Sequence, residues 1–188
     1  MRVIKLGGSL MNDERSLKLC LTTIEQAYND NVVIVPGGGV YADLIRSTQQ
    51  QWKFNEETAH QMAILAMKQF ALLLKSLHPT FMLVESLAAV QIRLKKAKVL
   101  IWSPDIKELF SMNAGWEVTS DSLAAWLANQ LRATELILVK SAEIPNNLNI
   151  QQAHKTGLVD KSFHTFTKNT SYKIILINKH QFNERNFN

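Results

Sequence analysis

Short aliphatic runs alternate along this chain with longer segments in which apolar residues recur every three or four positions. The short runs have the length and β-branched content of buried strands, and the longer segments have the periodicity of amphipathic helices. This alternation predicts an α/β fold, a three-layer αβα sandwich with a mainly parallel central sheet. We expect strands at about residues 2–6, 32–35, 81–84, 98–101, 136–139 and 173–177.

The helical segments divide the chain without an internal repeat or a linker, so we expect one domain over residues 1–180 and a polar, frayed tail over 181–188. Asn12 or Asp13 is suited to cap the first helix. Residues 141–149 are typical of a loop. We expect helices at about residues 13–28, from the second glycine turn to about 47, and at 56–77, 86–96, 104–110 and 123–132.

The segment 56–77 is apolar on most of its sides, which indicates a helix that is buried on more than one face. Two interpretations fit this pattern. The helix either lies in the centre of the core or also contacts a second copy of the chain. We take a homodimer or a higher homo-oligomer as the expectation, because the helix is long for a chain of 188 residues.

Composition narrows the class of protein and of partner. The net charge is +5 with scattered lysines, which favours anionic small molecules as ligands. The sequence has neither zinc-ligand spacing nor a concentrated basic stripe, so we expect no nucleic-acid partner. A single cysteine, Cys20, excludes an internal disulfide and has the spacing of a buried helix position. With no signal peptide and no membrane-length apolar stretch, we expect a cytoplasmic protein without a membrane partner.

Two glycine-rich turns, each directly behind a predicted strand, carry the clearest chemical signal. They are Gly7-Gly8-Ser9 and Pro36-Gly37-Gly38-Gly39. Glycines that lead from a strand into a helix let backbone N–H groups close on phosphate oxygens. Two such turns at one edge of a parallel sheet predict two phosphate-bearing ligands side by side, an arrangement suited to phosphoryl transfer.

Three ordered motifs resemble the amino acid kinase superfamily, which includes acetylglutamate kinase, aspartokinase, uridylate kinase and isopentenyl phosphate kinase. They are residues 5–9 (KLGGS), 35–39 (VPGGG) and 119–125 (TSDSLAA). The resemblance implies the fold of that superfamily, ATP as phosphoryl donor, and Mg²⁺ bound mainly by phosphates and water rather than by a dedicated protein site.

Four further segments resemble the small kinases of methanofuran and tetrahydromethanopterin pathways: residues 39–43, 59–63, 116–122 and 138–141. Archaeal members of that subgroup are [5-(aminomethyl)furan-3-yl]methyl phosphate kinases, so the resemblance implies a phosphate-monoester acceptor and a diphosphate product. The alternatives are another acceptor, such as a nucleoside monophosphate or a carboxylate, and a non-catalytic nucleotide- or oxyanion-binding protein. The usual acidic pair after the nucleotide-side strand is replaced by Lys140-Ser141, and the late Gly-Met-Lys stretch is reduced to residues 156–161.

The resemblance assigns catalysis to Lys5 and Asp121, and Lys140 is a third catalytic candidate because it follows an apolar strand, where a parallel strand delivers residues to the active edge. Lys5 would bridge the transferring phosphoryl oxygens, Lys140 would neutralise further phosphate charge, and Asp121 would orient the lysines. A general base is not expected, because a phosphate oxygen is already ionised near neutral pH. The competing interpretations are that Asp121 simply caps the following helix and that Lys140 is a surface lysine at a strand end.

The remaining candidates divide between the two ligands. The acceptor needs an anion site and, for an aminomethyl group, a carboxylate, for which Asp43 is the nearest candidate; Arg46 is suited to the acceptor phosphate. For either residue, a plain helix-surface position stays an alternative. Lys155 is a weaker phosphate candidate, His60 is a structural or a site residue, and Trp116 either packs in the core or walls the pocket. We expect ATP contacts from Gly7, Gly8, Ser9, Ser141 and Lys161, and acceptor contacts from Gly37, Gly38, Gly39, Asp43, Arg46 and Ser120.

Overall fold

The computed structural model describes residues 1–27, 30–109 and 115–184. Within these residues, six strands form one sheet in the order β3-β4-β2-β1-β5-β6, and every neighbouring pair is parallel. All strands therefore deliver their carboxyl ends to one edge of the sheet. The strands are β1 (Arg2–Leu6), β2 (Val32–Pro36), β3 (Met82–Val84), β4 (Val99–Trp102), β5 (Glu135–Lys140) and β6 (Lys173–Asn178).

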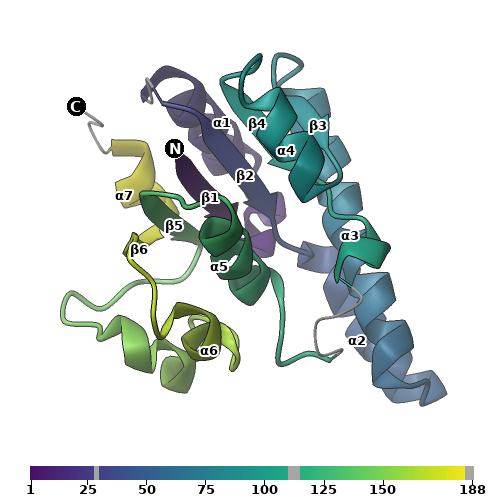
Figure 1. The fold of residues 1–188 in the computed structure, drawn as a ribbon. Coiled ribbons are helices and arrows are strands. Elements are labelled where there is room, and N and C mark those ends of the chain that lie inside the picture. Colours follow the sequence, from purple (N-terminus) through teal and green to yellow (C-terminus); the bar gives the residue numbers. More distant parts are fainter. Residues whose placement is uncertain (28–29, 110–114, 185–188) are drawn as a thin grey trace.

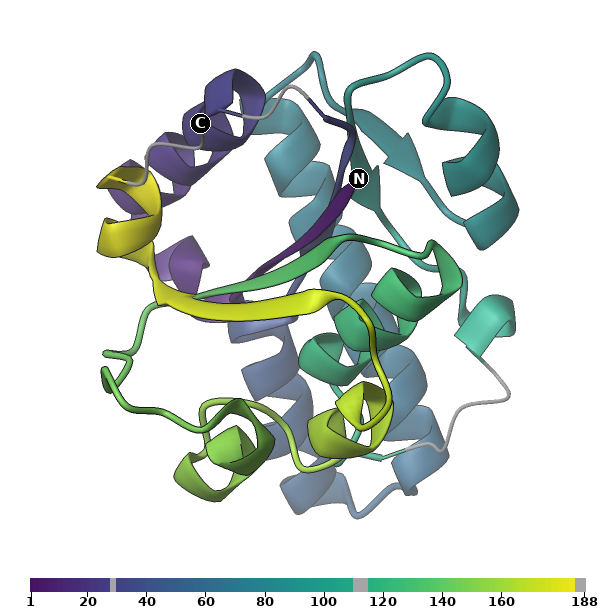
Figure 2. The same ribbon diagram turned by 60° about the vertical axis from the view of Figure 1, so that its left-hand side comes forward.

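Helices flank both faces of the sheet, which confirms the predicted three-layer α/β architecture (Figures 1 and 2). The α-helices are α1 (Glu14–Ala27), α2 (Gly39–Trp52), α3 (Glu56–Leu77), α4 (Leu87–Arg93), α5 (Ser120–Gln130), α6 (Phe163–Thr167) and α7 (Lys179–Glu184). Three 3₁₀ helices join them: η1 (Gly8–Asn12), η2 (Ile106–Leu109) and η3 (Ile150–Thr156).

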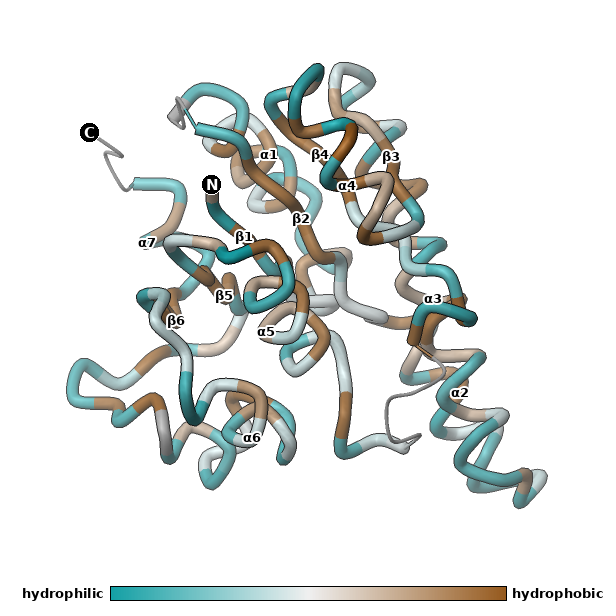
Figure 3. Tube along the Cα trace, in the orientation of Figure 1, coloured by the Kyte–Doolittle hydropathy of each residue, from teal (hydrophilic) through white to brown (hydrophobic). Residues whose placement is uncertain are grey.

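Successive strand residues point to opposite faces and so enter two separate apolar cores. In β1, Val3 belongs to the core that contains α5 and α6, whereas Ile4 belongs to the core that contains α1, α7 and the end of α3. The hydropathy colouring shows β2 as a largely apolar run (Figure 3). Such runs are typical of parallel strands that are covered on both faces.

The first residues of several helices follow local capping rules. The Asp13 carboxylate accepts hydrogen bonds from the backbone N–H and the hydroxyl of Ser16, at 3.0 and 2.8 Å, and thereby caps α1. Asn55 caps α3 by accepting from the Thr58 N–H at 2.8 Å. The prediction that the first helix is capped by Asn12 or Asp13 is confirmed for Asp13.

Several boundaries differ from those expected. Helix α2 continues to Trp52 rather than ending near 47, α4 ends at Arg93 rather than at 96, and α5 begins at Ser120 rather than at 123. Helices η3 and α6 lie in a region where no helix or strand is expected from the sequence. Of the helix expected over 104–110, residues 106–109 form η2, and Phe110 lies outside the described residues.

The expectation of a frayed tail over 181–188 is wrong for residues 181–184, which belong to a helix that begins at Lys179. This helix is α7, in which Phe182 is fully buried against the α1 core. The Lys179 ammonium also contacts the Asp13 carboxylate at 2.5 Å. Most residues of this segment are polar and only Phe182 is a buried aromatic residue, so composition alone could not predict the helix.

Helix α3 packs into the cores, as the central-core interpretation requires, while a contact with a second copy stays a prediction. Ile64, Phe70 and Leu74 are buried in the cores, but Leu65 and Leu72 stay 46% and 59% exposed. The expected buried position of Cys20 is confirmed. No helix in the described part of the chain combines the length and the apolarity that a membrane crossing requires.

Replacement of Phe182 by Ala tests whether α7 is part of the folded core. Loss of a fully buried phenylalanine should reduce the free energy of unfolding by roughly 3–5 kcal/mol, measured by urea denaturation. The control is Gln181→Ala in the same helix, an exposed position where we expect a change within about 0.5 kcal/mol. Equal, small effects of both substitutions would contradict the packing of α7.

Candidate active site

The two glycine turns lie against each other at the carboxyl edge of β1 and β2. A Cβ atom on Gly8 would lie 2.1 Å from the backbone nitrogen of Gly39, and one on Gly37 would lie 2.5 Å from the nitrogen of Gly8. Only glycine permits so close an approach of two backbones. Gly39 also has a φ of 54°, in the left-handed region. The predicted pairing of the two turns is therefore a property of the fold.

Beside these turns, Lys5, Asp121 and Lys140 form a buried ion triad. The Lys5 ammonium lies 2.8 Å from Asp121 Oδ1, and the Lys140 ammonium donates to both carboxylate oxygens at 2.7 Å. The three side chains are only 6%, 7% and 13% exposed. The three residues that the sequence singled out as catalytic thus converge on one point.

Topology explains this convergence. Strands β1 and β5 are neighbours, and Lys5 is in register with Leu138, two residues before Lys140. Residues two apart on a strand point to the same face, so both lysines reach the same side at the carboxyl edge. Helix α5 packs against that side and carries Asp121 in its first turn.

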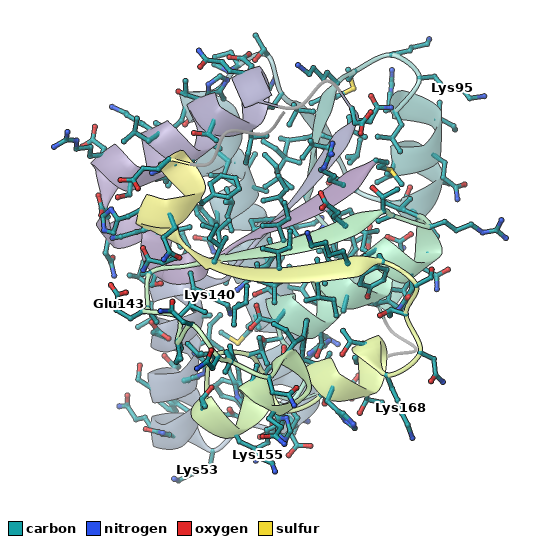
Figure 4. All side chains as sticks on the ribbon, turned by 90° about the vertical axis from the view of Figure 1, so that its left-hand side faces the viewer. Lys53, Lys95, Lys140, Glu143, Lys155 and Lys168 are labelled. Carbon is teal, nitrogen blue, oxygen red and sulfur yellow. The ribbon has the colours of Figure 1, made fainter. Side chains whose placement is uncertain are left out.

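The charges in the triad strongly perturb one another. Burial alone would raise the pKa of Asp121, but the ammonium groups of Lys5 and Lys140 outweigh it and lower the pKa to about 2. For Lys140, burial and the neighbouring Lys5 charge lower the pKa to about 8, against the opposing effect of Asp121. Lys140 is therefore not the solvated strand-end lysine that the alternative interpretation required (Figure 4).

A cavity of about 260 Å³ opens on the Lys5 side of the triad. One end of its wall is formed by the glycine turns and the other by α2, α3 and the segment before α5. The lining residues are Lys5, Gly8, Ser9, Gly38, Gly39, Ala42, Asp43, Arg46, His60, Ala63, Ile64, Met67, Gly115, Trp116, Val118, Thr119, Ser120 and Leu123.

A second cavity, of about 460 Å³, opens on the Lys140 side. Arg46, Trp116 and Thr119 line both cavities, so the two share a wall. The second cavity is lined by Arg46, Trp116, Glu117, Thr119, Asp121, Lys140, His154, Gly157, Leu158, Val159, Asp160 and Lys161. The triad therefore lies between two cavities, as transfer between two ligands requires.

The shared wall is built by a chain of side-chain contacts from α2. Arg46 pairs with Asp43 at 2.8 Å, and its guanidinium lies over the Trp116 ring, 4.3 Å from the ring centroid. The Trp116 indole N–H donates to Gln49 at 2.7 Å. Of the two interpretations of Trp116, the structure therefore favours the pocket wall.

Other candidates differ in how well the structure brings them to the site. The hydroxyls of Ser9 and Ser141 are 3.0 Å apart, so these two residues meet beside the first turn. Lys161 lines the second cavity, but its ammonium lies 3.4 Å from Glu117 and its side chain is 77% exposed. Lys155 is exposed and lines neither of the two cavities (Figure 4).

His60 lies in the wall of the first cavity and is buried there. Burial lowers the pKa of its ring, and a hydrogen bond to the Gly115 carbonyl only partly opposes this effect, so the imidazole is neutral near pH 7. Within the described residues its Nε2 atom has no hydrogen-bond partner. The structure thus places His60 at the site and gives it a structural hydrogen bond as well.

The interpretation of Asp121 as the helix N-cap is wrong, and the correction reveals a residue that the sequence analysis missed. Asp121 is the second residue of α5, and the N-cap position is Thr119. Asp160 lies at the start of α5, although it comes from a distant segment of the chain. Nothing in the local pattern around Thr119 indicates this partner; only the segment 156–161 had pointed to the region.

A magnesium site made of protein side chains alone does not fit the described residues. No group of three or more His, Cys, Asp or Glu side chains gathers there in a metal-binding arrangement. Both Asp121 oxygens already contact ammonium groups. The residues present fit a Mg²⁺ ion that is held mainly by the phosphate oxygens of a nucleotide.

Comparison with known proteins places this geometry in a family. Residues 1–143 match the model of the amino acid kinase family. The chain is 26% identical over 149 residues to the [5-(aminomethyl)furan-3-yl]methyl phosphate kinase of Methanocaldococcus jannaschii, an alignment that covers 76% of this chain and 67% of that protein.

The fold is similar to those of solved kinases. The uridylate kinase of Archaeoglobus fulgidus superposes with a TM-score of 0.72 at 18% identity, covering 97% of this chain and 94% of that one. The aspartate kinase of Synechocystis gives a TM-score of 0.74 at 11% identity, covering 95% of this chain and 38% of that one. The ordered motifs, the parallel sheet and the family match lead to one conclusion: this chain belongs to the amino acid kinase family and is an ATP-dependent phosphotransferase.

Proposed function

We propose that this kinase transfers the γ-phosphoryl group of ATP to a phosphate monoester, an aminomethylfuran phosphate of one-carbon cofactor biosynthesis, and releases a diphosphate. The observation that carries the proposal is the Lys5–Asp121–Lys140 triad between two cavities that share a wall. The similarity to the M. jannaschii furan phosphate kinase supports the choice of acceptor.

In this proposal the triad neutralises the charge that phosphoryl transfer brings together. Two phosphate-bearing ligands repel each other, and the transferring group spreads its charge over three equatorial oxygens. Lys5 and Lys140 offer fixed ammonium groups from opposite sides of that position. Asp121 holds both lysines in place, so little reorganisation is needed when the charge develops. The acceptor phosphate supplies its own ionised nucleophile.

ATP binds on the side of the second cavity. Its phosphates extend from that cavity toward the first one, whose wall contains Gly8 and Ser9, and there lie along the backbone of Gly7 and Gly8 beside the hydroxyls of Ser9 and Ser141. Lys161 reaches the outer phosphate region only after leaving Glu117, an exchange that costs little because that pair is exposed. Mg²⁺ enters with the nucleotide and adds further neutralisation of the phosphate charge.

The acceptor occupies the first cavity, with its phosphate against Gly38, Gly39 and Ser120, which line it; Gly37, the first glycine of the same turn, lines neither of the two cavities. Arg46 lies at the border of both cavities, where a guanidinium can contact the acceptor phosphate. Asp43 lines the same cavity and pairs with Arg46 at 2.8 Å, so its carboxylate would meet an ammonium group of the acceptor next to that guanidinium. The small volume of this cavity favours a compact acceptor.

The decisive experiment measures ADP release from Mg-ATP in separate reactions with aminomethylfuran phosphate, UMP and isopentenyl phosphate. We expect turnover with the furan phosphate and formation of its diphosphate, confirmed by mass spectrometry. Turnover only with another acceptor would refute the substrate but keep the phosphotransferase. Tight ATP binding without transfer to any of the three would instead support a non-catalytic binding protein.

Lys140 gives the reaction a specific pH dependence. Because its pKa is about 8 in the protein without ligands, kcat/KM should fall as pH rises through about 8, when the ammonium loses its proton. Lys140→Arg keeps the positive charge at high pH and should abolish this alkaline fall, although its maximal activity should be lower. An alkaline limb that is identical in both proteins would contradict the assignment.

The same residue should separate stability from activity. The pKa of Lys140 is lower in the folded protein than the ordinary value of 10.5, so the unfolded chain binds this proton more tightly. The charged Lys140 therefore lowers the free energy of unfolding at pH 7, and this cost disappears as pH rises from 8 to 10.5. Lys140→Met should therefore leave the melting temperature at pH 7 unchanged or raise it, because the Asp121 carboxylate still pairs with the Lys5 ammonium. The turnover number should fall ~10²- to 10³-fold.

We also propose that the enzyme is a homodimer in which a second copy covers the exposed side of α3. Leu65 and Leu72 are seven residues apart and so lie on the same side of that helix. Sedimentation equilibrium should give twice the chain mass, and the double variant Leu65→Lys, Leu72→Lys should sediment as a monomer. Ile92→Lys, at another exposed apolar position, is the control and should stay dimeric.

A further inference from the structure

The Asp160 carboxylate makes an unusually complete set of contacts with the start of α5. Its Oδ2 atom accepts from the Thr119 N–H at 2.9 Å, the Thr119 hydroxyl at 2.8 Å and the Ser122 N–H at 3.0 Å. Its Oδ1 atom accepts from the Ser122 hydroxyl. A carboxylate from 38 to 41 residues away therefore does the work of an N-cap, which the Thr119 side chain itself does not perform.

These contacts enclose the catalytic carboxylate. Thr119 and Ser122 flank the first turn of α5, and Asp121 lies between them. The position of the Asp121 oxygens between the two lysine ammonium groups thus depends on how Asp160 holds that turn. The negative charge of Asp160 also stabilises the positive end of the α5 dipole.

Asp160 also belongs to the wall of the second cavity, and so links that wall to the start of α5. Asp160 belongs to the lining segment 157–161, and the Ser162 N–H donates to the Glu117 carbonyl at 3.0 Å, which ties that segment to the residues before α5 a second time. Burial raises the pKa of Asp160, and the nearby Asp121 charge raises it further, although hydrogen bonds from Ser122 and Thr119 oppose the shift. A buried carboxylate in such surroundings is costly unless its hydrogen bonds are kept.

We propose that Asp160 is a positioning residue, which couples the nucleotide-side wall of the second cavity to the Asp121 carboxylate. A nucleotide that orders the segment 157–161 then also orders the first turn of α5 and the triad. This inference rests on the proposed kinase mechanism, and it assigns Asp160 no direct contact with the reacting atoms.

The test is Asp160→Asn, which keeps the shape but removes the charge and one acceptor oxygen. With the proposal correct, the turnover number should fall roughly 10- to 100-fold, more than any change in the KM for the acceptor, because the triad is misplaced. The alkaline limb should also move to lower pH, since Asp121 is the group that raises the pKa of Lys140.

Asp13→Asn is the matched control, because Asp13 caps α1 in the same way but lines neither of the two cavities. Both variants should lower the melting temperature. If Asp160→Asn lowers it but leaves the turnover number and the alkaline limb as in the control, Asp160 is a structural cap only and the proposal is wrong.

Two further measurements keep the test decisive. If Asp160→Asn does not fold, Ser122→Ala removes one of the four hydrogen bonds and should shift both readouts in the same direction by less. If the unaltered protein transfers no phosphoryl group, the proposed function fails. The titration of Lys140, followed by NMR of reductively ¹³C-methylated protein, then still tests the positioning role. A lower pKa of Lys140 in Asp160→Asn would support that role, and an unchanged pKa would contradict it.

Discussion

One carboxylate between two ammonium groups is the interaction on which the site depends. Without Asp121, two lysines would bring like charges together in the protein interior, where each is poorly solvated. With it, the pair is tolerated but strained, as the lowered pKa of Lys140 shows. The two ammonium charges lower the stability of the protein without ligands but can neutralise bound phosphates. Catalytic sites commonly give up stability for function in this way.

The glycine turns impose a second, purely steric condition. The two turns touch through backbone atoms alone, so the phosphate-binding edges of β1 and β2 are held at a fixed separation. Side chains at these positions would separate the turns and with them the two ligands. The electrostatic and the steric conditions meet at the end of β1, since Lys5 lies only two residues before the first glycine of its turn.

Local signals in the sequence were sufficient for the sheet and for the main elements of the site. Buried parallel strands are continuous aliphatic runs, and glycines after a strand indicate a turn wherever they occur. The convergence of Lys5, Asp121 and Lys140 followed from the family resemblance together with the rule that parallel strands end at one edge. Their roles in the reaction stay proposals, whereas their proximity is a property of the structure.

The features that the sequence did not reveal depend on contacts between distant segments. Helix α5 begins three residues early because Asp160 caps it from another part of the chain, and no window around Thr119 contains that information. Helix α7 forms because Phe182 finds the α1 core, although the residues around it are polar. Helix α6 is only five residues long, too short for a periodic pattern.

The wall that both cavities share has a thermodynamic consequence. Arg46 and Trp116 are held to each other and, through Asp43 and Gln49, to α2, so each belongs to two ligand environments at once. A ligand that shifts this pair in one cavity changes the affinity of the other cavity, and linkage requires the two effects to be equal in free energy. Donor and acceptor would then report on each other's presence before any bond is broken.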